Sequence, residues 1–291
     1  MTKKYAFFRG CFIPSRAPHI EHVARKFFPE LGVELHDVRG FTCCPEPTGF
    51  SLHEKLTWLT IAARNISLAE EQGLDILTLC NGCYYTLKHT VDELEDAELR
   101  SRVNEALSET GHQFTGRAKV KHFVQVLDED IGVKRISQAV KVPLEGLRVA
   151  AHNGCHFTNR YGLEARLLDD LVSATGASSV EYDLKNLCCG WMIGAYGQQE
   201  DGYTWLKNRL ESMKRAEADC VTVICPQCYQ QYDTGQMMAS RKLGIPFKTP
   251  VLFYLQLLGL AMGHSLEEVQ YGSHRVKDAG FEEKVRTILG A

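Results

Sequence analysis

Ten cysteines in this chain fall into two copies of one spacing pattern, and they are the residues best suited to carry chemistry. In each copy a single cysteine is followed by an adjacent pair and then by a Cys-x-x-Cys motif, with 31 or 32 residues in the first interval and 35 in the second. Cysteines scattered through a hydrophobic core would not repeat in this way. We therefore expect each copy to bind a metal. The first copy is Cys11, Cys43, Cys44, Cys80 and Cys83, and the second is Cys155, Cys188, Cys189, Cys225 and Cys228.

Five thiolates that include an adjacent pair suit an iron–sulfur cluster better than a zinc ion. A structural zinc takes four ligands in a tetrahedron, commonly from paired Cys-x-x-Cys motifs. Neighbouring side chains on an extended backbone point in opposite directions, so Cys43 and Cys44 could hold two irons more easily than one small ion. Soft thiolates also select iron–sulfur clusters, and the usual cubane spacing is absent. The pattern favours an unusual cluster in each copy, with zinc as the alternative.

Short apolar runs precede the cysteines and predict the strands that position them. Helical spacing of apolar residues predicts the helices between these strands, and the strongest is residues 51–73, with Ser51 and Glu54 as a capping box. Glycines before Cys11 and Cys155 would let the backbone approach a cluster closely. The predicted strands are residues 5–8, 33–38, 75–79, 149–152, 180–183 and 221–224, and the other predicted helices are 19–28, 84–94, 163–174 and 201–218.

The order strand–helix–strand–helix–strand therefore occurs twice, which predicts an α/β protein made of a duplicated domain with mostly parallel sheets. We place the domains at residues 1–143 and 144–291, because Pro143 and Gly146 mark a boundary. Ligands of such sheets bind outside the carboxyl ends of the strands. In each half, that is where the first cysteine and the Cys-x-x-Cys motif fall.

Composition excludes several classes of protein. The 291 residues carry a formal net charge of −3, with 44% hydrophobic and 24% charged residues, so no basic stripe indicates a nucleic-acid partner. The N-terminal apolar run is too short for a signal peptide. The longest apolar run, residues 251–262, is too short for a membrane span. We expect a cytoplasmic protein, where eleven cysteines favour metal ligation over disulfides.

The cysteine spacing resembles that of the CCG, or cysteine-rich, domain family. Cys188-Cys189-Gly190 supplies the three residues of the family name, whereas Pro45 replaces the glycine in the first copy. Two copies in a chain of this length look like the B-type subunit of the heterodisulfide reductases of methanogens and their relatives, as do the sequences at residues 5–11, 80–84 and 250–263. The resemblance implies two Rossmann-like domains related by a pseudo-twofold axis, with the cysteines at the carboxyl ends of the strands.

The resemblance also implies a reaction. Each copy would hold a noncubane 4Fe–4S cluster through its five cysteines, and the mixed disulfide of coenzyme M and coenzyme B would lie between the two clusters. Each cluster would give one electron and take one sulfur, so that the S–S bond is cleaved homolytically. Proton transfer would then complete two thiols. Such a chain is an oxidoreductase that acts on a disulfide in the last step of methanogenesis.

Partner subunits follow from the same resemblance. A small C-type subunit with two cubane iron–sulfur clusters would pass electrons in, a flavin-containing A-type subunit would bifurcate them, and a hydrogenase or formate dehydrogenase would lie upstream. The chain has neither a cubane motif nor a G-x-G-x-x-G motif after a strand. That absence fits a protein that receives electrons from others.

Histidines beside the second copy are weaker candidates for substrate binding. His152 and His156 flank Cys155 and could bind metal, donate a proton or hydrogen-bond to cluster sulfur. Phe8 and Phe12 stand at those places in the first copy, so a histidine is not needed for ligation. The alternative is a packed or hydrogen-bonded histidine.

Arginines near the cysteine loops are the other candidates. Arg9, Arg16 and Arg160 could hold the sulfonate or phosphate of the coenzymes, because a guanidinium suits such groups. Solvation at the surface is the alternative for each. Cys220 stands outside both copies and is expected to be a core thiol.

Other functions are compatible with the same cysteines. Paired CCG domains also occur in electron-relay subunits of lactate-, glycolate-, glycerol-3-phosphate- and succinate-oxidising complexes, and in sulfur-oxidising relatives of heterodisulfide reductase. A zinc-stabilised assembly scaffold is a non-enzymatic alternative. Metal content would separate the scaffold from the others, and activity with the heterodisulfide would separate the redox proteins.

Overall fold

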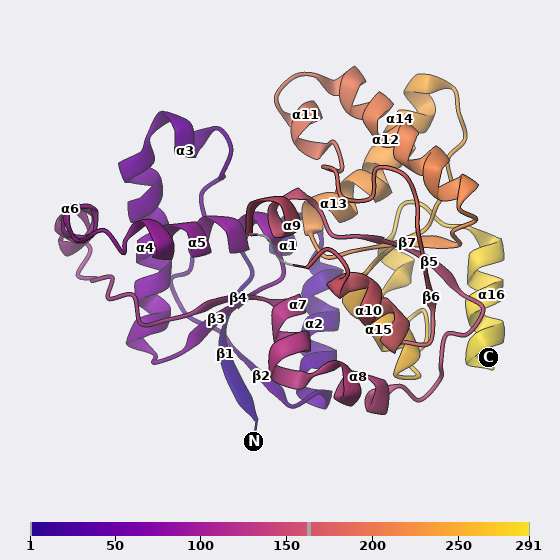
Figure 1. The fold of residues 1–291 in the computed structure, drawn as a ribbon, viewed down its shortest axis with the longest axis horizontal. Coiled ribbons are helices and arrows are strands. Elements are labelled where there is room, and N and C mark those ends of the chain that lie inside the picture. The colour runs from indigo at the N-terminus through magenta and orange to yellow at the C-terminus, as the bar shows by residue number, and fades with distance from the viewer. Residues whose placement is uncertain (1, 162–163, 291) are drawn as a thin grey trace.

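The computed structural model describes residues 2–161 and 164–290, which form two four-stranded sheets with all strands parallel. The two sheets lie side by side (Figure 1). The first has the order β2-β1-β3-β4, with β1 (Lys3–Phe8), β2 (Val33–His36), β3 (Asp75–Thr78) and β4 (Val120–His122). The second has the order β6-β5-β7-β8, with β5 (Arg148–His152), β6 (Ser178–Val180), β7 (Cys220–Val223) and β8 (Val251–Phe253).

The repeated strand order confirms the predicted duplicated α/β architecture. The first strand of each half lies between the next two in equivalent register, since Tyr5 pairs with Asp75 and Val149 pairs with Cys220. Cys220 is fully buried in β7. The fourth strand of each sheet was not predicted. Strands β4 and β8 are only three residues long, so their apolar residues cannot be distinguished in the sequence from those of the helix that follows.

Helices connect the strands and cover the sheets. In the first half these are α1 (Phe12–Arg16), α2 (Pro18–Glu30), α3 (Phe50–His53), α4 (Lys55–Glu71), α5 (Asn81–Glu93), α6 (Ala97–Ser108), α7 (Phe123–Gln125), the π-helical turn η1 (Val126–Ile131) and α8 (Val133–Ala139). In the second half they are α9 (Cys155–Tyr161), α10 (Leu167–Ala174), α11 (Trp191–Ala195), α12 (Gln199–Arg215), α13 (Pro226–Gln230), the π-helical turn η2 (Gln231–Gly235), α14 (Gln236–Leu243), α15 (Tyr254–Ala261), the 3-10 turn η3 (Tyr271–Ser273) and α16 (Ala279–Leu289).

The helix predicted over residues 51–73 is wrong at its start. The chain leaves the helical conformation at Glu54, with φ −134° and ψ 71°, so α3 and α4 are separate helices. The Glu46 carboxylate stabilises the turn before this break by accepting hydrogen bonds from the main-chain N–H groups of Thr48 and Gly49. Ser51 donates to the main-chain oxygen of Pro47 and caps nothing. The helix predicted from residue 163 begins at Leu167, and residues 162 and 163 lie outside the described residues.

Helices from the two halves pack in symmetrical pairs. Helix α5, which carries the first Cys-x-x-Cys motif, packs on α9, which begins at the first cysteine of the second copy. The equivalent contact in the other direction is made by α13 on α1, and α2 packs on α15. Labels α1, α9 and α13 accordingly cluster where the two halves meet in Figure 1. The pairing brings both sets of cysteines to the interface between the halves.

The buried apolar residues form one core that is continuous across both halves. The division predicted after residue 143 falls in the segment between β4 and β5 and stays a prediction. None of the helices in residues 2–161 and 164–290 combines the length and the apolar character that crossing a bilayer would require.

Candidate metal centre

The first cysteine set lies at the carboxyl ends of β1, β2 and β3. Cys11 follows β1 at the amino end of α1, and Cys80 follows β3 at the amino end of α5. Cys83 is in the first turn of α5, and the adjacent pair lies in the loop after β2. The predicted strand ends therefore place these cysteines where sequence reasoning put them.

The five sulfurs of the first set form a connected group. The Sγ atoms of Cys43 and Cys11 are 3.6 Å apart. Cys44 interacts with Cys43 and Cys83, and Cys83 in turn interacts with Cys80. Cys11 and Cys43 are exposed and the other three are buried. A cavity of about 170 Å³ opens onto all five, and it is also lined by Arg9, Phe12, Glu46, Pro47, Gly82, Pro226 and Gln227.

The second set repeats this arrangement with less exposure. Cys155 begins α9, Cys225 lies at the amino end of α13, and Cys188 and Cys189 lie in the loop between β6 and α11. Cys188 interacts with Cys155 and Cys189, and Cys189 interacts with Cys228. The main-chain N–H of Gly190 donates to Cys188 Sγ at 3.5 Å. Every cysteine of this set is buried or half-buried.

The two sets meet at the interface between the halves. Cys80 of the first Cys-x-x-Cys motif interacts with Cys225 of the second. Beside them, Asn81 Nδ2 donates a hydrogen bond to the main-chain oxygen of Asn153 at 2.7 Å, and both residues are buried. The ten thiols thus form one continuous group, and a ligand at one set would lie next to the other.

Hydrogen bonds between the thiols shift their pKa values in opposite directions. Hydrogen bonds from Cys43 and Cys83 lower the pKa of Cys44, and those from Cys155 and Cys189 lower the pKa of Cys188. Cys80 donates to Cys225, and this hydrogen bond raises the pKa of Cys80. Further ionisation is opposed because each new thiolate would lie against an existing one. A metal that replaced the shared protons would let the whole set ionise.

Two glycines allow the backbone to pass close to the sulfurs. Gly10 has φ +63°, and a Cβ there would lie 2.7 Å from Cys83 Sγ. Gly154 has φ +73°, and a Cβ there would lie 2.6 Å from Asn81 Nδ2 and 3.4 Å from Cys228 Sγ. Any side chain at either position would intrude on the sulfurs or their supports. The soft, closely spaced donors and the cradles left by the two glycines fit a metal–sulfur cluster.

The two predicted histidines lie at the second set. A nitrogen of His152 and the Sγ atoms of Cys189 and Cys228 all lie within 4.8 Å of one another. His156 Nδ1 is 3.2 Å from Cys155 Sγ, and its ring packs edge-on against Tyr85 of the first half. The structure therefore brings both histidines to the sulfurs.

The predicted arginines are distributed differently. Arg9 lines the cavity at the first set, where its guanidinium pairs with Glu21 at 3.1 Å. Arg16 lines a second cavity of about 310 Å³ beside helix α11, which follows Cys189, together with Trp191, Tyr203 and Met238. The Arg160 side chain lies outside the described residues.

Sequence reasoning missed two features of the site. His122 ends β4 and is fully buried near Cys225, and this burial lowers the pKa of its imidazole to about 3. The internal repeat could have found it, because His122 stands where Phe253 stands in the second half. Glu46 accepts a hydrogen bond from Tyr196 Oη at 2.9 Å, which joins the loops after the two cysteine pairs. No sequence pattern predicts that contact.

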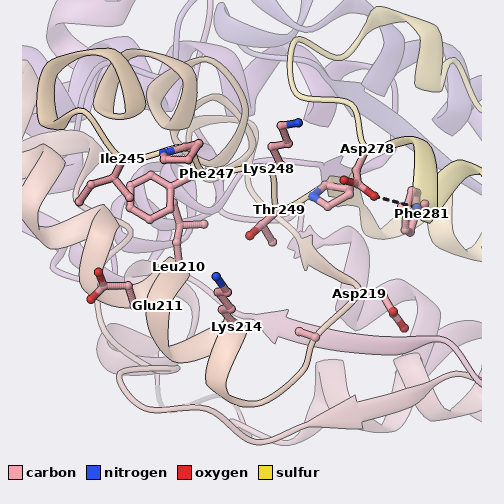
Figure 2. Close-up of a pocket in the computed structure, with 14 residues that line it drawn as sticks. Leu210, Glu211, Lys214, Asp219, Ile245, Phe247, Lys248, Thr249, Asp278 and Phe281 are labelled. Atoms are coloured by element: carbon pink, nitrogen blue, oxygen red, sulfur yellow. Dashed lines mark hydrogen bonds between the residues drawn. The ribbon is translucent and has the colours of Figure 1, made fainter.

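A larger cavity, of about 660 Å³, lies at the amino ends of β7 and β8, and none of these cysteines lines it. Figure 2 shows its walls, which come from α12, residues 245–250 and the start of α16. Asp219 pairs there with Lys284 at 2.7 Å, and Asp278 accepts from the main-chain N–H of Phe281. Size alone does not identify the site, and the cysteine sets remain the candidate.

Comparison with known proteins gives a consistent result. The chain matches the cysteine-rich domain family, CCG, over residues 5–88 and 149–233. It is 38% identical to the B-type subunit of the ferredoxin/F420H2-dependent CoB–CoM heterodisulfide reductase of Methanosarcina acetivorans, over 98% of both chains. It is also 30% identical to the 8-methylmenaquinol:fumarate reductase membrane anchor subunit of Wolinella succinogenes, over 96% of this chain and 99% of that protein.

A solved structure shares the fold. The crystal structure of a hypothetical protein from Helicobacter pylori superposes with a TM-score of 0.77 at 16% identity. The match covers 96% of this chain and 53% of that one. At this identity the likeness concerns the fold alone.

Proposed function

Because this chain belongs to the CCG cysteine-rich domain family and matches a heterodisulfide reductase B-type subunit over nearly its whole length, we propose that it is the subunit that reduces the coenzyme M–coenzyme B heterodisulfide. One observation carries the proposal: two sets of five cysteines meet through Cys80 and Cys225 at the interface between two equivalent halves. A disulfide held at that interface would have one set on each side.

Each set would hold one noncubane 4Fe–4S cluster. Five sulfurs in one connected group exceed the four that a structural zinc uses. The lowered pKa values of Cys44 and Cys188 support the proposal, because a metal binds the thiolate form of cysteine. When bound, the clusters would supply the two electrons, one from each side. The ligands would be Cys11, Cys43, Cys44, Cys80 and Cys83 in the first set and Cys155, Cys188, Cys189, Cys225 and Cys228 in the second.

The overall reaction balances with two electrons and two protons for each disulfide. One S–S bond breaks, both sulfurs are reduced, and two thiols leave. In this proposal the chain orients the substrate through its anionic ends. Arg9 lies in the cavity at the first set and is steadied by Glu21, while Arg16 lines the cavity next to the second set. A guanidinium in each cavity suits a sulfonate or phosphate.

The protein would act in a complex. The Methanosarcina relative is named as one lettered subunit of its enzyme, which implies a multi-subunit reductase for that protein. We extend this to the present chain and propose two partners, a C-type subunit with cubane iron–sulfur clusters and a flavin-containing A-type subunit. A hydrogenase or formate dehydrogenase would supply the electrons upstream.

An electron-relay function is the second candidate. The Wolinella relative, named as a membrane anchor subunit of a fumarate reductase, favours it. In that case the clusters would pass electrons without binding substrate sulfur. The two functions predict the same metal content and differ in their response to thiols.

The first test measures iron, sulfide and zinc in anaerobically prepared protein, followed by EPR after oxidation with coenzyme M present and by heterodisulfide reduction with an artificial donor. We expect about eight irons per chain, about four in each set, a thiol-dependent EPR signal and disulfide reduction. Cys80→Ala should lose about half the iron, whereas Cys220→Ala, a matched change of a buried thiol outside the sets, should lose none. Zinc in place of iron would refute the proposal, and full iron without a thiol response would favour the relay.

A further inference from the structure

A guanidinium without an anionic partner lies in the interior of the second half. Arg209, on helix α12, has no exposed surface. Its Nη1 group donates to the main-chain oxygen of Trp205 at 3.2 Å, and its Cζ atom lies 5.0 Å from the centre of the Trp205 ring. The Nε and Nη2 groups are buried and have no hydrogen-bond partner, carboxylates included, among the described residues.

Such a group is unfavourable to bury. A guanidinium keeps its positive charge in proteins, and a buried charge is strongly destabilising unless an opposite charge accompanies it. The contact with the Trp205 ring and the one main-chain acceptor offset only part of this cost. Arg209 therefore requires a negative charge nearby.

The second cysteine set lies within electrostatic reach of this guanidinium. Burial raises the pKa of Tyr232, and Cys189 and Cys228 raise it further. The positive charge of Arg209 acts on the same buried hydroxyl and lowers its pKa. Since such effects weaken with distance, the guanidinium and these two cysteines all lie near one hydroxyl group.

Trp205 provides a second link to the same cysteines. Its Nε1 donates to the main-chain oxygen of Cys188 at 2.8 Å, while its ring lies against the guanidinium. The half-buried carboxylate of Asp169 in the same half pairs with Lys185 instead, at 2.6 Å. The thiolates of the second set are thus the negative charges that the surroundings offer.

The equivalent arginine of the first half is placed differently. Arg64 stands 20 residues after Cys44, as Arg209 stands 20 residues after Cys189. Arg64 is half-buried, and its Nη1 group donates to the main-chain oxygen of Gly40 at 2.9 Å. Water therefore reaches and screens the charge of Arg64, whereas the charge of Arg209 is enclosed.

We propose that Arg209 supplies a fixed positive charge to the second metal site, with the metal–sulfur group held by that cysteine set as its counter-ion. The inference rests on the proposed function, since it requires an iron–sulfur cluster at the second set. Such a cluster becomes more negative on reduction, so an enclosed positive charge nearby stabilises the reduced state and raises the reduction potential. The second site is therefore easier to reduce than it would be without Arg209.

The test is a redox titration of the iron-loaded protein followed by EPR, with the iron content of each variant measured. Arg209→Met removes the charge and keeps most of the side-chain volume, so it should lower one midpoint potential and leave the other in place. Arg209→Lys keeps the charge and should retain most of the original potential. Arg64→Met is the matched control at the equivalent position, and it should leave the potential that depends on Arg209 unchanged.

Iron content decides the case in which the charge is needed for the cluster to bind at all. Loss of about half the iron from Arg209→Met, with iron retained in Arg209→Lys, would support the inference. Unchanged midpoints in Arg209→Met at full iron content, or equal losses of potential or of iron in both variants of Arg209, would overturn it and leave the proposed function standing. Unaltered protein that binds no iron–sulfur cluster would refute the proposed function instead.

Discussion

Replacing Gly154 with alanine tests how tightly the two halves are joined at the cysteines. Gly154 has φ +73°, a conformation that costs a residue with a side chain about 1–2 kcal/mol. The new Cβ would also lie 2.6 Å from Asn81 Nδ2, so Asn81 must move and give up its hydrogen bond to the Asn153 main-chain oxygen. Loss of that buried bond costs about 1–3 kcal/mol. The total expected loss in the free energy of unfolding is about 2–5 kcal/mol.

A double-mutant cycle separates these two contributions. Asn81→Ala alone removes the hydrogen bond and should cost about 1–3 kcal/mol. In that background Gly154→Ala meets no Asn81 side chain, so only the backbone cost of about 1–2 kcal/mol remains. The two substitutions should therefore be less than additive, by about 1–3 kcal/mol. Urea denaturation of anaerobic, equally metallated proteins measures all four corners of the cycle. Additivity within about 0.5 kcal/mol would show that the contact between the halves is not what Gly154 protects.

Three further predictions concern acid stability and the loop contact. Burial lowers the pKa of His19 to about 4. Between pH about 6.5 and 4 the unfolded state therefore binds a proton that the folded state does not bind, so the free energy of unfolding falls as the pH drops below about 6.5. His19→Phe should abolish about 2 kcal/mol of the loss between pH 7 and 5, measured by urea titration; an unchanged acid slope would contradict this. Although burial raises the pKa of Asp130, hydrogen bonds from Lys121, Lys3 and Tyr5 lower it to about 2. Asp130→Asn should cost about 1–2 kcal/mol at pH 7, and the difference should vanish as pH falls from about 4 to 2; a constant difference would refute it. Tyr196→Phe removes the bond to Glu46 and should change stability by less than about 1 kcal/mol, yet it should speed proteolysis of residues 45–54, and unchanged cleavage would argue against a role for this contact.

The duplicated α/β fold could be predicted from the sequence because the two halves carry the same order of apolar runs and cysteines. The Cys-x-x-Cys motifs lie just after the carboxyl ends of strands, as the sequence predicted, because ligands of parallel sheets bind at those ends. The short strands β4 and β8 escaped prediction because three residues do not establish a period. The break at Glu54 also escaped, because local capping rules favoured Ser51 and could not anticipate that Glu46 would cap the preceding turn.

Contacts between the halves were beyond the reach of sequence reasoning. The hydrogen bond from Asn81 to Asn153 joins residues 72 positions apart, and Tyr196 meets Glu46 across 150 positions. Neither pair belongs to a motif. Such contacts depend on how the two sheets pack, which no local pattern specifies.

The internal repeat separates what the two cysteine sets share from what differs between them. All five cysteines of one set have a counterpart in the other, and both sets follow the same strands. The surroundings differ: His152 takes the place of Phe8, Pro226 in the second Cys-x-x-Cys motif takes the place of Asn81 in the first, and Gly190 takes the place of Pro45.

Ligation alone would permit two identical halves. Under the proposed function, a disulfide between the sets would meet different side chains on its two sides, and this inequality gives the difference a possible use. The five paired cysteines are therefore the part of the repeat that a common binding task in both halves explains, and the neighbours that differ are the part that it leaves unexplained.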